Sequence, residues 1–293
     1  MYEQISSNVW KSYGLILLFV ILILGLGYVF GEATGYPQIL PAAVIFAVAS
    51  SFGSYYYSDR IVLAMSRARP ATREEHAHLV NSVEGLAIAA GLPVPKIYVI
   101  EDSAPNAFAT GRDPNHAVIC VTTGLMEKLN RVELEGVIGH EMAHVKGYDI
   151  RVMTLVAVLA GVVVLISDWL LRSMWYGRGI SRRRRVQGGP VILVVALAAG
   201  VLAPLVATLV RLAISRSREF LADAQGALLT RYPDGLADAL ERIIADKEPL
   251  EAANKATAHM YIVNPLRNIG GPLNALFSTH PPAEERVSRL RAM

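Results

Sequence analysis

The chain has 293 residues, which is enough for one sizeable soluble domain together with membrane-embedded structure. Hydrophobic residues make up 53% of the chain and charged residues only 18%, a balance that a purely soluble protein seldom reaches. The net charge of +3 comes largely from arginines near apolar segments, which suits a lipid bilayer better than nucleic acid. Cys120 is the only cysteine, so an intrachain disulfide is excluded, and its apolar surroundings predict a core residue.

Four apolar segments are long enough to cross a hydrocarbon core of ~30 Å, which takes ~20 helical residues. Segments 13–30 and 39–57 contain no charged residue and predict an uncleaved N-terminal membrane hairpin. Segments 152–171 and 190–210 predict a second membrane hairpin, or alternatively a hairpin buried in a soluble core. The chain therefore divides into a transmembrane hairpin (1–59), the first half of a soluble domain (60–151), a second transmembrane hairpin (152–210) and the second half of the soluble domain (211–293).

The charges beside these segments predict their orientation. Lys11 precedes the first segment and Arg60 and Arg67 follow the second, whereas the turn 31–40 has neither Lys nor Arg. The positive-inside rule therefore places the N-terminus and the region after Tyr57 in the cytosol. An arginine-rich stretch, 172–185, opposes this rule if segments 152–171 and 190–210 both span. Either the first hairpin dictates the orientation, or the later pair lies shallowly on the cytosolic face.

The soluble parts combine several helices with a few short strands. Periodicity predicts a helix over 72–90 and strands over 96–100, 106–110 and 117–122. A further helix begins at Arg131, with Asn130 as its N-cap and Glu133 completing a variant of the capping box. Helical patterns continue to 228 and recur at 232–246 and 283–291. These elements predict an α+β fold, mainly α-helical, with a small β-sheet and four transmembrane helices.

The string His140-Glu141-Met142-Ala143-His144 is the strongest functional signal. On a helix, the two histidines lie on one face, where both imidazoles can bind one zinc ion. Glu141 sits beside the first ligand, where its carboxylate can act as the general base of a hydrolase. The alternative interpretation is a pair of surface histidines on an ordinary helix.

An open zinc site needs a third protein ligand, and Glu219 is the candidate. Asp223 shares its helix face at i+4 and can hold the second nitrogen of a zinc-bound histidine. Without the upstream motif, this pair would be interpreted as a solvated helix edge. Asp149 is interpreted as a helix end in preference to a partner of the site. The remaining histidines lack ligand spacing and are predicted at the surface: His76, His78, His116 and His259.

The segment Asn106, Ala107, Phe108 and Ala109 is a candidate substrate-binding strand. If it forms the edge of the sheet, an extended peptide can add to it through main-chain hydrogen bonds, which gives sequence-tolerant binding. An ordinary core hairpin explains the same pattern equally well.

Several strings resemble the HtpX family of membrane metalloproteases, which are gluzincins related to the CAAX prenyl proteases. They are Pro105 to Gly111, Gly139 to His144, Ser215 to Asp223, and Ser278 to Pro282 with Glu285 and Arg286. The resemblance covers nearly the whole chain. It implies a gluzincin-like domain with one zinc ion per chain, facing the cytosol from a prokaryotic cell membrane and degrading damaged or misfolded membrane proteins. It also places a histidine of this kind near the metal with an arginine six residues on, here His280 and Arg286. Because an open zinc site needs a donor to the oxyanion, His280 is the candidate for that role, with Arg286 supporting it. Alternatively, His280 only caps the loop before the last helix.

Three other functions compete with this one. A CAAX-type prenyl protease would be expected to have more membrane spans than four. A non-catalytic membrane adaptor or chaperone would use a closed, usually thiol-rich zinc site, against which the single cysteine and Glu141 argue. A transporter is disfavoured because the predicted spans contain almost no ionisable residues.

Overall fold

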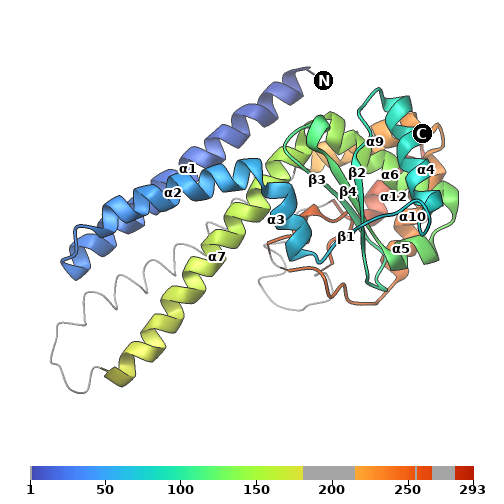
Figure 1. The fold of residues 1–293 in the computed structure, drawn as a ribbon. Helices are drawn as coiled ribbons and strands as arrows, with labels where there is room; N and C mark the ends of the chain where they lie inside the picture. The colour runs from blue at the N-terminus through green and yellow to red at the C-terminus, as the bar shows by residue number, and fades with distance from the viewer. Residues whose placement is uncertain (1, 181–214, 255, 266–280) are drawn as a thin grey trace.

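The computed structural model describes residues 2–180, 215–254, 256–265 and 281–293 (Figure 1). Helices dominate these residues, and one four-stranded sheet lies in the globular part. This is the mainly helical α+β fold that the sequence predicts. The fourth predicted membrane segment, 190–210, and His280 lie outside the described residues.

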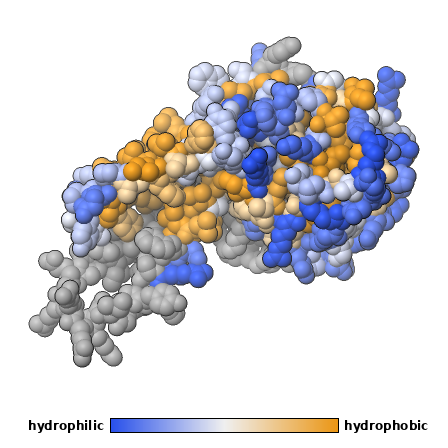
Figure 2. All heavy atoms as spheres, viewed as in Figure 1, coloured by the Kyte–Doolittle hydropathy of each residue, from blue (hydrophilic) through white to orange (hydrophobic). Residues whose placement is uncertain are grey.

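Three long helices extend from the globular part as an arm (Figure 1). Helices α1 (Tyr2–Thr34) and α2 (Ile39–Tyr56) form a hairpin, and α7 (Asp149–Ile180) runs away from the globular part near them. Within the described residues, these three helices are long and apolar enough to cross a membrane. Hydrophobic residues cover much of the arm, whereas the globular part carries many hydrophilic ones (Figure 2).

Helix α7 differs from the other two because its first half is packed inside the protein. In its apolar window 67% of the residues are buried, against 28% in α1 and 11% in α2. On one side, Val152, Val156 and Leu159 pack against the α1 residues Leu15 and Phe19. On another, its residues join a cluster beneath the sheet that contains the buried Cys120, which confirms the core position predicted for this cysteine.

The sheet has the order β1-β2-β4-β3, with β3 at one edge of the described strands. Its strands are β1 (Arg69–Pro70), β2 (Lys96–Ile100), β3 (Ala107–Thr110) and β4 (Val118–Thr122). Strands β2 and β4 run parallel, whereas β3 pairs antiparallel with β4 and β1 with β2. The strand predicted to begin at Asn106 begins one residue later.

Helices cover the sheet and connect its strands. They include α3 (Ser58–Met65), α4 (Ala77–Ala90), α5 (Thr123–Lys128), α6 (Arg131–Lys146), α9 (Arg216–Thr230), α10 (Pro233–Ala245) and α12 (Ala283–Arg291), with short 3-10 turns at Pro114–His116 and Ala258–Met260. Helix α4 starts five residues later than predicted, at Ala77, and ends at Ala90. The next residue, Gly91, has a left-handed φ of 66°, which suits a glycine C-cap.

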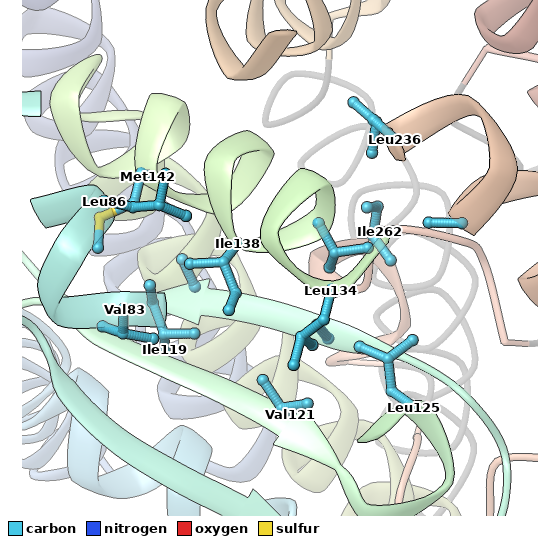
Figure 3. Packing of buried hydrophobic residues seen from close by; sticks show 14 of the residues in the cluster. Val83, Leu86, Ile119, Val121, Leu125, Leu134, Ile138, Met142, Leu236 and Ile262 are labelled. Atoms are coloured by element: carbon cyan, nitrogen blue, oxygen red, sulfur yellow. The ribbon is translucent and has the colours of Figure 1, made fainter. Parts of the chain in front are cut away.

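Helix α6 is the central helix of the globular part. Its capping box is confirmed: Asn130 Oδ1 accepts from the Glu133 backbone at 3.1 Å, and Glu133 accepts from the Asn130 backbone at 2.9 Å. One face of the helix packs Leu134, Ile138 and Met142 over the sheet (Figure 3). The helix is buried on nearly all sides, which is why its sequence lacks a single apolar stripe.

Glycines let α9 approach α6 more closely than other residues would. A Cβ atom added to Gly226 would lie 2.8 Å from the backbone nitrogen of His140, closer than real Cβ atoms come. On the other side of this contact, a Cβ on Gly139 would lie 3.2 Å from the Gly226 carbonyl oxygen. The two backbones therefore meet at this crossing, which fixes how far α9 lies from the histidines of α6.

We predict that Gly226→Ala destabilises the protein although alanine favours helices. Alanine gains about 1 kcal/mol of helix propensity over glycine, but overpacking against a backbone atom typically costs about 1–3 kcal/mol. The matched control is Gly85→Ala in α4, where an added Cβ meets nothing within 4 Å. Thermal unfolding should show a lower midpoint for Gly226→Ala only. Equal midpoints in the two variants would contradict a tight crossing.

Candidate metal centre

Two helices bring three ligand-type side chains together in the interior. His140 and His144 extend from α6 and Glu219 from the first turns of α9, and all three are buried. The Nε2 atoms of the two histidines are 3.1 Å apart. The Glu219 carboxylate lies 3.5 Å from Nε2 of His144 and 3.9 Å from Nε2 of His140. These are the three ligands that the sequence pattern proposes, now found as one convergent group.

The donor set fits a zinc ion. Tetrahedral zinc with bonds of ~2.0–2.1 Å places neighbouring ligand atoms about 3.3 Å apart, close to the separations within this group. Two imidazole nitrogens and one carboxylate leave a fourth position open, as in catalytic zinc sites. Charge also favours a cation. Glu141, Asp149, Glu219 and Asp223 are four buried acids, and Arg218 and Arg286 are two buried guanidinium groups beside them.

Each histidine has a carboxylate at its other ring nitrogen. Asp223 Oδ1 lies 2.9 Å from Nδ1 of His140, and Asp149 Oδ2 lies 3.2 Å from Nδ1 of His144. A proton on Nδ1 is therefore held by a carboxylate in both rings, and Nε2 of each ring faces the ligand group, where it can bind a metal. Asp223 thus lies where the i, i+4 spacing predicts.

The preference for a helix end over a partner of the site is wrong for Asp149. Asp149 does begin α7, but it is also buried against His144, which makes it a partner of the site. Helix α6 ends at Lys146, and Tyr148 has a left-handed φ of 60°, so the chain turns sharply before α7 begins. A spacing of five residues does not place two side chains on one helix face, and only this turn between two helices returns Asp149 to His144.

Arg286 enters the site from α12 and is 1% exposed. Its Nε and Nη2 atoms donate to the two oxygens of Asp223 at 2.9 and 2.7 Å, and its Nη1 donates to the Ile262 carbonyl at 2.9 Å. Burial alone raises the pKa of Asp223, but Arg286 and His140 outweigh burial and lower it to about 2. The two-pronged contact makes Arg286 the group that orients Asp223 toward His140.

Glu141 is buried beside the three ligands without belonging to their group. Burial is the main cause that raises the pKa of its carboxyl to about 7, against opposing contributions from His144 and a hydrogen bond with the backbone of Ala109. Burial and Arg286 lower the pKa of His140 to about 4, so its ring is neutral at pH 7. A carboxyl group with a pKa near neutrality can both accept and return a proton at physiological pH.

The predicted substrate strand lies at the sheet edge, beside this carboxylate. Asn106, just before β3, donates to the Val263 carbonyl at 2.9 Å, and the Ala107 carbonyl accepts from Ile262 at 3.0 Å. The Phe108 side chain packs edge-on against Tyr261 in the core and is fully buried. Residues 262–263 of the protein itself therefore hydrogen-bond to Asn106 and Ala107 at the start of this edge. Further along it, the backbone of Ala109 bonds to Glu141.

The surface prediction is wrong for one of the other histidines. His259 is buried, and its Nε2 contacts the Met153 carbonyl of α7 at 3.0 Å, because the 3-10 turn that carries it packs under α7. His78 and His116 are exposed as predicted, and His76 is half-buried.

Comparison with known proteins agrees with this geometry. Residues 73–293 match the model of peptidase family M48. The chain therefore belongs to peptidase family M48, and it is a membrane metalloprotease, a hydrolase.

Its relatives are more specific. The chain is 46% identical over 296 residues to a protease HtpX homolog of Dictyoglomus turgidum, which covers 100% of this chain and 94% of that protein. It is 46% identical over 300 residues to a protease HtpX homolog of Thermoanaerobacter pseudethanolicus, covering 100% and 98%. These relatives confirm the HtpX resemblance seen in the motifs. The crystal structure of S. mikatae Ste24p superposes with a TM-score of 0.49 at 21% identity, over 99% of this chain and 67% of that one.

We predict that Asp149→Asn and Asp223→Asn each weaken zinc binding by ~10–100-fold, the usual effect of changing a carboxylate behind a histidine ligand. Either change removes the negative charge that holds the Nδ1 proton. Competition with chelators of graded affinity measures the effect. Glu127→Gln, at an exposed acid on α5, is the control and should bind zinc like the wild type. If Asp149→Asn binds like this control, its contact with His144 does not support the metal.

Proposed function

We propose that the protein is a zinc-dependent endopeptidase that cleaves membrane proteins on the cytosolic side of a prokaryotic cell membrane. One observation carries this proposal: the buried group of His140, His144 and Glu219, with the Glu141 carboxyl beside it. One zinc ion per chain, held by these three side chains, would supply a Lewis acid for the peptide carbonyl and the attacking water. The protease relatives support a peptide substrate.

Glu141 is the proposed general base. Its carboxylate takes a proton from the attacking water and later gives that proton to the leaving amine. Its pKa of about 7 suits both transfers near neutral pH, and the backbone of Ala109 holds the carboxylate at the edge of the sheet. Asp223 sets the direction of the His140 ring and its proton, and Arg286 holds Asp223 in place while its Nη2 lies 3.3 and 3.4 Å from the two nitrogens of that ring.

An extended peptide is the proposed substrate form. In an antiparallel pair, backbone groups of alternate residues point away from the partner strand. The Ala107 carbonyl bonds outward to Ile262, so the backbone of Ala109, two residues on, also points outward, toward Glu141. Ala109 is buried and its backbone is bonded to Glu141, so a substrate strand pairs there by displacing this contact, which places its peptide bonds beside the base. Binding through the main chain tolerates many sequences, which suits the degradation of misfolded proteins.

The arm supports an action at the membrane. Only Gly147 and Tyr148 separate the metal-binding helix α6 from α7, so the site lies next to the start of a candidate span. In the first turn of α7, Arg151 stacks on the rings of Tyr13 and Tyr55, and tyrosines are enriched at membrane interfaces. We propose that 1–59 and 152–210 insert in the membrane, and that 60–151 and 211–293 form one cytosolic protease domain.

The central test is Glu141→Gln. The variant should keep zinc, because Glu141 is not a ligand, while turnover falls by ~10²–10⁴ or more because the base is lost. Zinc content and cleavage of casein by the purified full chain are measured together. Glu219→Ala, in contrast, should lose most of its zinc. Wild-type cleavage by Glu141→Gln would sink the assignment.

His280, outside the described residues, is the proposed donor to the oxyanion. Removal of one such donor typically lowers kcat by ~10²–10³, with little change in KM when the contact exists only in the transition state. His280→Ala should therefore cleave slowly and hold zinc normally, whereas the control His78→Ala, at an exposed histidine of α4, should cleave and bind zinc like the wild type. A His280→Ala protein with wild-type kcat would leave this histidine without a part in the reaction.

A further inference from the structure

The first membrane helix contributes a side chain to the surroundings of the metal centre. Asn8 lies near the start of α1 and is only 1% exposed. Its Nδ2 atom donates to the Gly147 carbonyl at 2.9 Å and to Asp149 Oδ1 at 2.8 Å. Both acceptors belong to the junction between α6 and α7, more than 130 residues away along the chain. A buried amide from the polar first turns of α1 is thus fixed at the end of the metal-binding helix.

The contacts of Asn8 define which way its amide points. Its Oδ1 atom accepts from Nη1 of Arg218 at 3.1 Å, while Nδ2 faces two oxygen acceptors. A flipped amide would bring oxygen against oxygen and NH₂ against a guanidinium, so only one orientation satisfies the site. Both the nitrogen and the oxygen of the Asn8 amide therefore make hydrogen bonds.

Asp149 connects this amide to the metal ligands. Its Oδ1 atom accepts from Asn8 and, at 3.1 Å, from Arg218, while its Oδ2 atom faces Nδ1 of His144. With Oδ1 held by two donors, the carboxylate plane is fixed and Oδ2 is aimed at the ring. Arg218 directly precedes Glu219 in α9, so the same cluster also fixes the helix turn that carries the third ligand.

The membrane helices hold Asn8 in this place. From the next turns of α1, Leu15, Phe19 and Ile23 pack against buried residues of α7. Between them and Asn8, Ser12 is also buried, but its hydroxyl donates to the Asn8 carbonyl of its own helix. Asn8 is thus the α1 residue that exchanges hydrogen bonds with the junction and with α9, among the bonds described.

We infer that Asn8 is a positioning residue for the metal centre, acting on His144 through Asp149. The first membrane helix then completes the active site in addition to anchoring the chain. This inference rests on the proposed metal site, because it assigns Asn8 a role in holding one ligand of that site. The competing interpretation makes Asn8 a structural anchor between α1 and α7 without effect on metal binding.

The test measures zinc affinity of the full chain by competition with chelators, independently of proteolysis. Asn8→Ala removes the amide and retains a good helix former, and Asn8→Asp keeps its shape but places an anion against Asp149. Both should weaken zinc binding, Asn8→Ala by about 10-fold, at the lower end of effects seen behind histidine ligands. Ser12→Ala is the matched control, from the same buried side of the same helix, and should bind within about 2-fold of the wild type.

A double-mutant cycle separates positioning from anchoring. If Asn8 acts through Asp149, Asn8→Ala should change zinc affinity by less than about 2-fold in the Asp149→Asn background. A loss of affinity by the same factor in both backgrounds would contradict an action through Asp149, and an anchor alone would give no loss in either background. If Asn8→Ala fails to fold, Asn8→Leu, which removes the amide without adding a charge against Asp149, takes its place in the cycle. Asn8 variants that fold and bind zinc like Ser12→Ala overturn the inference, whereas a wild type that binds no zinc contradicts the proposed function itself.

Discussion

The burial of charged groups around His140 and His144 is the constraint on which the rest of the structure depends. A carboxylate removed from water is stable only when it is paired or hydrogen-bonded, so each buried acid needs a defined partner. Arg286 provides that partner for Asp223, and Arg218 with Asn8 provides it for Asp149. These partners lie on α12, α9 and α1, so helices from the N-terminal and C-terminal parts of the chain contact the site. Removal of one partner would leave a buried charge uncompensated.

The two imidazoles share one hydrogen-bonding pattern, although Arg286 also contacts both nitrogens of His140. Each ring has Nδ1 against a carboxylate and Nε2 toward the other ring. The two carboxylates differ in what holds them. Asp223 lies one helical turn after Glu219 on α9 and is gripped by a guanidinium from α12, entirely within the globular part. Asp149 lies at the start of a candidate membrane span and is held partly from another such span. The carboxylate behind His140 is therefore held by the globular part alone, whereas the carboxylate behind His144 is held partly by the membrane arm.

Close helix packing complements these polar contacts. Gly139 and Gly226 let α6 and α9 meet backbone to backbone, and Glu219 lies two turns before Gly226 on the same helix. On its other side α6 packs apolar residues over the sheet, so the helix has little freedom to shift (Figure 3). A metal centre built on such a fixed helix keeps its ligand separations, because the helix cannot move without opening the core.

The sequence by itself determined what depends on local spacing. The i, i+4 histidines, the i, i+4 pair Glu219 and Asp223, the capping box at Asn130 and the apolar lengths of three membrane segments all follow from helix geometry and were predicted. Tertiary structure alone decided the contacts between distant elements. Asp149 was misinterpreted because a sharp turn at Tyr148, invisible to periodicity, returns it to His144. His259 was misplaced because the packing of its turn under α7 is a long-range contact. Asn8 carried no signal beyond a polar residue before an apolar run, because its partners lie more than 130 residues away and only the folded chain brings them together.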